Sequence, residues 1–236
     1  MQFLVFQLQA ALAAWGDVAV GEYRGSRDHP GESALIGLLG AALGVRREHE
    51  AAHATLRDGY RFAVGVVATG QLLRDYHTAQ VPGRTALKGR PHHTRRDELS
   101  LPRHELNTIL STRDYRQNAA CAVAVVALPD APHPLADLAQ ALREPQFVLY
   151  LGRKCCPPAA PLAPQVTDAE SAHAAITAYL ATTQPPAALR SLAWSDGMPA
   201  GQTAHLSAPR KDRLIRRQGW HFGDRTEHLA LLAEDD

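Results

Sequence analysis

A basic segment at residues 84–96, with the sequence RTALKGRPHHTRR, could bind a polyanion. It holds five Lys and Arg side chains and no acid, and Gly89 and Pro91 within it argue against a packed helix. A flexible basic finger suits phosphate contacts, because Lys and Arg displace counterions from nucleic acid. A solvated surface loop would have the same composition, so charge alone leaves both interpretations open. The candidate phosphate contacts in this segment are Lys88, Arg90, Arg95 and Arg96.

A second candidate contact site is the STRDY sequence at residues 111–115. Arg113 can present its guanidinium fork to a phosphate, and Tyr115 can stack on a nucleobase. The same sequence would also fit the start of an exposed strand in which Arg113 pairs with Asp114. The pattern therefore indicates a possible RNA contact without excluding a purely structural role.

A third candidate is the sequence LYLGRKCCPP at residues 149–158. Gly152 allows close backbone approach, and Arg153 and Lys154 follow it directly, where they could meet an anion. The adjacent thiols of Cys155 and Cys156 are poor partners for one tetrahedral metal, which usually takes ligands spaced two to four residues apart. We therefore expect no metal or other cofactor, and one buried thiol.

A fourth basic stretch, RKDRLIRR at residues 210–217, precedes Trp220 and Phe222. Cations interleaved with aromatic rings are typical of RNA-binding surfaces. An amphipathic surface strand would have the same pattern. The candidate contacts here are Arg210 and Lys211.

Histidines raise the possibility of catalysis. His77 follows Asp75 and Tyr76, and His92 and His93 lie nearby in the sequence. Such a group could cleave RNA by acid–base chemistry through the 2′-hydroxyl. However, the chain has no paired-histidine metal motif, no nucleophile elbow and no phosphate-binding loop. We therefore expect no catalytic residues, and metal-independent cleavage of RNA stays the alternative.

A hydrophobic core must position these segments, and the chain is long and apolar enough to form one. The chain has 236 residues, of which 45% are hydrophobic and 21% are charged, which is typical of a soluble globular protein rather than a disordered one. Strand and helix patterns follow in the order β-α-β-β-α-β, which predicts an α+β protein with a ferredoxin-like fold, also found in RNA recognition motifs. The predicted elements are strands at 1–8, 60–68, 119–128 and 147–151, and helices at 33–43, capped by Ser33, and at 135–143.

The remaining segments define the expected domain organisation. A ferredoxin-like domain at 1–151 contains a long insertion at 72–110, and a C-terminal region at 152–236 with a helix near 169–180 packs on it. No apolar run reaches the length of a membrane span, and the N-terminus lacks the features of a signal peptide. Three cysteines do not make a disulfide framework, so we expect a cytoplasmic protein without membrane contacts.

Five segments, in order, resemble those of a known family. They are AWG at 14–16, SALIGLLGAALG at 33–44, DYHT at 75–78, TILSTRDY at 108–115 and YLGRKCCP at 150–157. Together they are similar to the type I-E form of CRISPR-associated protein 5, a subunit of the Cascade surveillance complex. Two sites depart from the family pattern: AALAA at 10–14 replaces its Gly-Pro motif, and Glu32 replaces a cation.

The resemblance implies a modified, RAMP-type RNA recognition motif with a protruding thumb made by the insertion. It implies binding of the 5′ handle of the guide RNA (crRNA), with His77 among the contacts. It also implies packing against the backbone subunit and the large PAM-reading subunit, and indirect contact with target DNA, in antiviral defence. The type I-E form is not a nuclease, whereas the related type I-C form cleaves repeat RNA.

Overall fold

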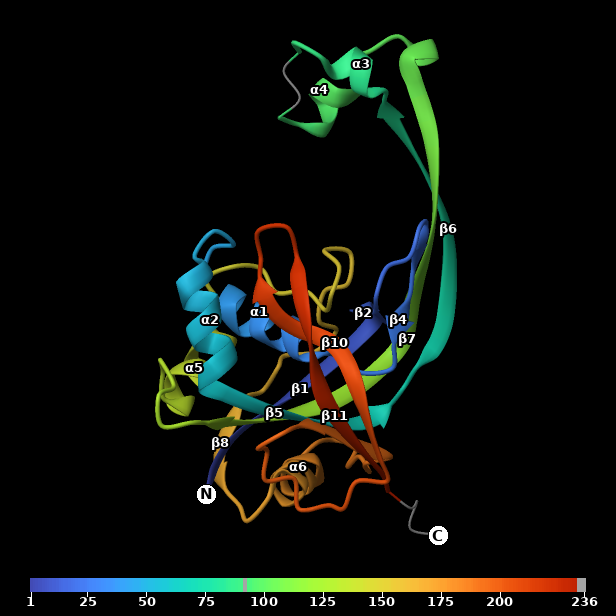
Figure 1. The fold of residues 1–236 in the computed structure, drawn as a ribbon. Helices are drawn as coiled ribbons and strands as arrows, with labels where there is room; N and C mark the ends of the chain where they lie inside the picture. Colours follow the sequence, from blue (N-terminus) through green and yellow to red (C-terminus); the bar gives the residue numbers. More distant parts are fainter. Residues whose placement is uncertain (91–92, 233–236) are drawn as a thin grey trace.

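The computed structural model, which describes residues 1–90 and 93–232, is built on one large, mostly antiparallel sheet. Its strands follow the order β10-β11-β9-β5-β7-β1-β8, and β3 and β6 also pair with β7. Figure 1 shows this sheet crossing the body of the molecule, with a long ribbon rising from one end. The strands are β1 (Gln2–Ala13), β2 (Trp15–Gly16), β3 (Tyr23–Arg24), β4 (Ser26–Arg27), β5 (Tyr60–Ala68), β6 (Gln71–Pro82), β7 (Leu106–Ala127), β8 (Gln165–Asp168), β9 (Ser191–Ser195), β10 (Leu206–Arg216) and β11 (His221–Leu231).

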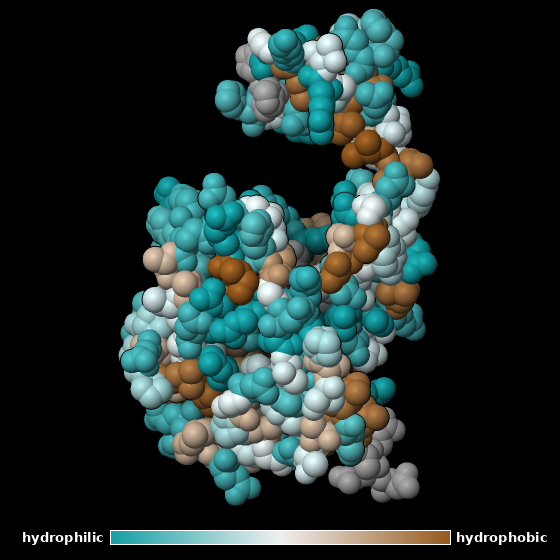
Figure 2. Space-filling view, viewed as in Figure 1, coloured by the Kyte–Doolittle hydropathy of each residue, from teal (hydrophilic) through white to brown (hydrophobic). Residues whose placement is uncertain are grey.

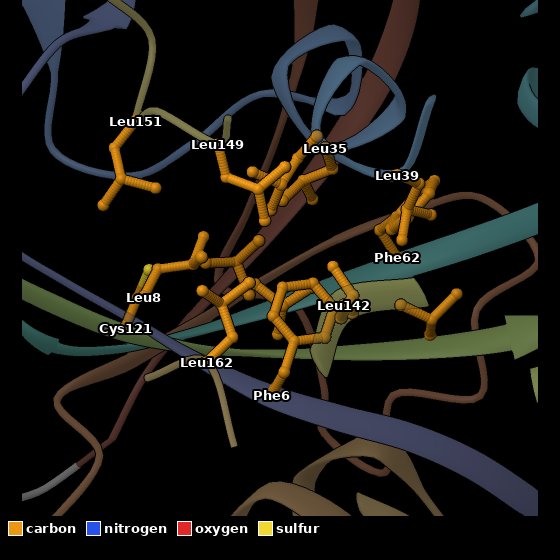
Figure 3. Close-up of a cluster of buried hydrophobic side chains, with 14 of the residues drawn as sticks. Phe6, Leu8, Leu35, Leu39, Phe62, Cys121, Leu142, Leu149, Leu151 and Leu162 are labelled. Atoms are coloured by element: carbon orange, nitrogen blue, oxygen red, sulfur yellow. The ribbon is translucent and has the colours of Figure 1, made fainter. Parts of the chain in front are cut away.

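Helices cover both faces of the sheet. Alternate residues of β1 point to opposite faces, so Phe6 and Leu8 belong to one core cluster while Phe3 and Val5 belong to another. Helices α1, α2 and α5 cover the first face, and α6 covers the second (Figure 1). Figure 3 shows side chains of the first cluster. The helices are α1 (Glu32–Ala42), α2 (Glu50–Gly59), α3 (Arg84–Leu87), α4 (Arg95–Leu99), η1 (Arg103–Glu105, a 3-10 turn), α5 (Leu135–Arg143) and α6 (Ala172–Ala181).

The predicted strand at residues 147–151 is wrong, because this segment is extended but lies outside the sheet. The Phe147 N–H donates to the Ala41 carbonyl at the end of α1, and the Leu151 N–H donates to the Cys156 carbonyl. The edge of β1 is occupied by β8 instead, which pairs with it antiparallel. The alternating pattern of the segment arises because Leu149 is buried against the first cluster while its neighbours face outward.

The predicted cap of α1 is also corrected. The helix begins at Glu32 with Gly31 at the N-cap position, one residue before the expected Ser33. The Glu32 N–H donates to the carboxylate of Asp212 at 3.0 Å, so a side chain from β10 satisfies the first turn of the helix. Glu32 itself is buried, and burial raises the pKa of its carboxyl group.

The long stretch between β5 and the sheet portion of β7 forms an ordered ribbon. Strand β6 pairs with the first half of β7 from Gln71↔Gln117 to Pro82↔Leu106. Its tip consists of α3, α4 and η1, and Thr94 and Asp97 form a capping box at α4. The predicted flexible finger is therefore a structured tip, while Pro91 and His92 lie outside the described residues.

The expectation that Arg210 contacts RNA is wrong, because its side chain is only 3% exposed. Its guanidinium pairs with Asp212 at 3.0 Å and with Glu227 at 2.7 Å, and it also contacts His29. Arg225 pairs with the same two carboxylates. This buried ion cluster joins the β10–β11 hairpin to the loop before α1.

Replacing Arg210 by Met should lower the free energy of unfolding by about 3 kcal/mol, because it leaves buried carboxylates short of a cation. The exposed neighbour Lys211 provides the control, and Lys211→Met should stay within about 0.5 kcal/mol of the parent. Urea unfolding followed by circular dichroism measures both. Equal stability of the two variants would contradict the structural role of the cluster.

Candidate nucleic-acid interface

Asp114, at the base of the ribbon, is the buried centre of a polar cluster. Its carboxylate is 1% exposed and accepts two hydrogen bonds from Arg74, at 2.9 and 3.1 Å, and one from the Tyr23 hydroxyl at 2.5 Å. The bonds from Arg74 and Tyr23 lower the pKa of Asp114, and the bond to Asp114 raises the pKa of Tyr23. This bidentate arrangement fixes β6, β7 and β3 to one another.

Arg153 connects the same place to the segment that follows Leu151. Its guanidinium donates to the carbonyls of Asp114 and Arg24, each at 3.1 Å, and lies 4.5 Å from the ring centroid of Tyr115. The order of the segments predicts that residues 113–115 and 152–154 lie close together, and the structure brings Asp114, Tyr115 and Arg153 into contact.

Tyr115, however, is not available as the expected stacking platform. Its ring is 7% exposed and belongs to the core, with the Arg153 guanidinium over it. Arg113 is half-buried, and its Nε donates to the Ser111 hydroxyl at 3.3 Å. Lys154 is exposed beside them. Arg153 therefore has a structural role, with both terminal nitrogens bonded to backbone carbonyls.

Gly152 allows the backbone of the YLGR segment to lie in direct contact with the AWG segment. Its φ is +89°, in the region that favours glycine, and a Cβ here would overlap the carbonyl oxygen of Ala14. The Ala14 N–H in turn donates to the Leu151 carbonyl at 3.0 Å. The backbone after Leu151 therefore packs directly against the end of β1.

A groove opens beside this contact, along the outer side of α1. Its cavity volume is about 390 Å³, and its floor includes the small residues Gly37 and Ala41. A second hollow of about 510 Å³ adjoins it and reaches Lys211. The side chains that line the first part include Arg24, Arg153, Arg217, Tyr150, Trp220 and Phe222. The groove is thus lined by cations and aromatic rings.

The ribbon tip carries the other group of cations. Lys88 and Arg96 are exposed, whereas Arg90 donates to the Ser100 carbonyl at 3.0 Å. Arg95 pairs with Glu98 at 2.7 Å and also bonds to the Gln80 carbonyl. Figure 2 shows the tip standing away from the body, with a mostly hydrophilic surface.

Of the three histidines considered for catalysis, the structure describes His77 and His93. His77 lies on the exposed ribbon, with its Nδ1 atom 3.6 Å from a carboxylate oxygen of Asp75. His93 is exposed at the tip, and His92 falls outside the described residues. Within the described part of the chain, no group of three or more His, Cys, Asp or Glu side chains is placed to hold a metal ion.

Nearly the whole chain matches one known family. Residues 3–226 match the family model described as CRISPR-associated protein (Cas_Cas5). The chain belongs to this family. It is 34% identical over 170 residues to the CRISPR system Cascade subunit CasD of Escherichia coli K12, covering 68% of this chain and 69% of that protein. The family assignment inferred from the five sequence segments is therefore confirmed.

Solved structures show that this CRISPR-associated protein shares its fold with others. A chain of a CRISPR RNA-guided surveillance complex superimposes with a TM-score of 0.63 at 23% identity, covering 97% of this chain and 89% of that one. A crystal structure of a Cas protein gives a TM-score of 0.64 at 24% identity, covering 99% and 96%. At these identities the likeness concerns the fold.

The candidate contacts predicted from the sequence of this CRISPR-associated protein did not include Arg24 or Arg74, and Arg217 was included only within the basic stretch at 210–217. Arg24 and Arg217 line the groove, and Arg74 pairs with the buried Asp114. The sequence did contain a signal for the ion cluster. Opposite charges two residues apart in a strand lie on the same face and indicate ion pairs, as for Arg210 with Asp212 and for Arg225 with Glu227 on the paired strands. That signal would have assigned Arg210 to ion pairs within the protein.

Replacing Gly152 by Ala should destabilise the protein by about 3 kcal/mol or more, since backbone strain of roughly 1–2 kcal/mol adds to the overlap with Ala14. Gly89 is the matched control, because its φ is also positive but a Cβ there would have nothing within 4 Å. Gly89→Ala should therefore cost no more than the strain alone. Thermal and urea unfolding would measure both, and equal losses of stability would show that the contact with Ala14 is unimportant.

Proposed function

We propose that this chain is a non-catalytic subunit of a Cascade-type surveillance complex, which binds the 5′ handle of the guide RNA and caps the backbone of the complex in antiviral defence. The observation that carries the proposal is the position of the two groups of cations. One lies at the ribbon tip and the other along the groove, and β7, which begins at the tip, pairs with the short strand β3 that carries the groove residue Arg24. Single-stranded RNA requires such cations along its path.

The finer architecture that we propose is a ferredoxin-like, RAMP-type domain with a thumb. The order β8-β1-β7-β5, all antiparallel, supports it, with α1 and α2 between β1 and β5 and with α5 between β7 and β8. Because β8 supplies the edge strand, this unit extends to residue 168 rather than to 151. The β6–β7 ribbon is the proposed thumb, and β9, β10 and β11 extend the same sheet.

The proposed partners follow from the membership of CasD in Cascade. The thumb would extend onto the adjacent backbone subunit, and other surfaces would meet the large PAM-reading subunit, with target DNA contacted only through the complex. No helix among the described residues is long and apolar enough to cross a bilayer. We propose that the complex acts in the cytoplasm.

The ribbon tip provides the direct test of RNA binding. Changing Lys88, Arg90, Arg95 and Arg96 to Gln should weaken binding of single-stranded repeat RNA and flatten its salt dependence by roughly 0.7 for each phosphate that the variant no longer binds. Fluorescence anisotropy at several salt concentrations measures both quantities. Glu105→Gln, which removes an acid from the same ribbon tip, is the matched control and should bind RNA at least as tightly as the parent.

Two results would contradict the proposal. An unchanged affinity and salt slope in the fourfold variant would show that the tip faces solvent. Metal-independent, site-specific cleavage of repeat RNA by the purified chain, abolished by His77→Ala, would show that the chain is a nuclease of the type I-C kind. The proposal predicts that the RNA stays intact throughout the binding experiment.

A further inference from the structure

The tip of the β10–β11 hairpin carries an aromatic ring into the groove in an unusual conformation. Trp220 is 49% exposed, whereas Trp15 and Trp194 are buried. Its φ is +53°, in the left-handed region that bulky residues rarely occupy. Such a conformation persists only where the surrounding structure holds it, and it is concentrated at functional sites.

The hairpin tip is fixed by a carboxylate of α2. Glu50 accepts hydrogen bonds from the backbone N–H groups of Arg217, at 3.0 Å, and Gln218, at 2.6 Å. These bonds lower the pKa of Glu50, because they stabilise its carboxylate form. The Trp220 N–H closes the turn by donating to the Arg217 carbonyl at 3.1 Å. The backbone of the hairpin tip is therefore held in place by hydrogen bonds within the protein.

Two cations and one aromatic ring flank the indole, which stays half exposed, and the Phe222 ring stacks on it with centroids 6.3 Å apart. The guanidinium carbons of Arg47 and Arg217 lie 4.9 and 5.7 Å from the centroid of the Trp220 ring. Arg217 lies against Gly37, whose missing side chain leaves room for it, and burial followed by the charge of Arg47 lowers the pKa of Arg217. Among the described residues, no group hydrogen-bonds to the buried Nε of Arg217. Such a cation favours an anionic partner.

We propose that Trp220 is a stacking site for one unpaired nucleobase of the guide RNA, with the flanking phosphates bound by Arg24 and Arg217. The proposal rests on the proposed RNA-binding function and assigns a particular residue to it. Every base offers a π face, so such a site tolerates sequence variation. A purely apolar partner would instead bury the guanidinium groups without counter-charges, which is unfavourable.

The test uses the full chain and two labelled probes of equal length, an oligoadenylate RNA and an abasic ribose-phosphate chain. Trp220→Ala should weaken binding of oligoadenylate by between about 5-fold and 150-fold, the effect of removing one base–aromatic stack. It should leave binding of the abasic chain and the salt slope of oligoadenylate binding unchanged. Trp220→Phe should restore most of the affinity, because it keeps an aromatic face.

Ile215 supplies the control for this experiment, since it is an exposed apolar side chain of the same hairpin. Ile215→Ala should bind both probes as the parent does. If Trp220→Ala binds oligoadenylate like the parent, the stacking site is refuted while RNA binding stands. An equal loss of affinity for the two probes would show that Trp220 acts only on the shape of the groove, which also overturns the proposal. If the parent binds neither probe, the proposed function itself fails.

Discussion

The structure depends on β7, a single strand whose two halves lie in different environments. The second half of β7 lies in the centre of the sheet, where Val123 and Val125 are fully buried, and its first half forms the exposed ribbon with β6. Asp114 lies at the transition, where Arg74 and Tyr23 neutralise and bind its buried carboxylate. An isolated two-stranded ribbon is only marginally stable in water, so this anchor and the continuity of β7 must hold it.

The charges of the molecule are divided between structure and ligand binding. Arg210 and Arg225 are buried with carboxylates and hold the C-terminal hairpin to the start of α1. That attachment places the hairpin tip, and with it Arg217 and Trp220, on the rim of the groove. A net charge of only +1 does not reveal this division, because the 25 Lys and Arg side chains are offset by 24 Asp and Glu side chains wherever each of them lies. The proposed RNA-binding role therefore rests on the local placement of cations rather than on the overall charge.

Much of the fold could be predicted because its elements follow simple periods. The strand at 60–68 and the helix at 135–143 have the predicted bounds, since each has a clear apolar face bounded by polar residues. The segment at 147–151 was misassigned because extended backbone packed on α1 alternates like a strand. Arg210 and Tyr115 were misassigned because sequence shows residue type but not burial. The groove joins segments more than 200 residues apart, which no local pattern reveals.

The central claim is that guide RNA runs between the ribbon tip and the groove. Ultraviolet cross-linking of repeat-derived RNA to the full chain, followed by mass spectrometry of the cross-linked peptides, tests it most directly. The account predicts cross-links in residues 84–96 and in residues 217–222, with α6 and β9 unlabelled. Cross-links confined to the α6 face of the sheet, or the absence of any from both predicted regions, would contradict it.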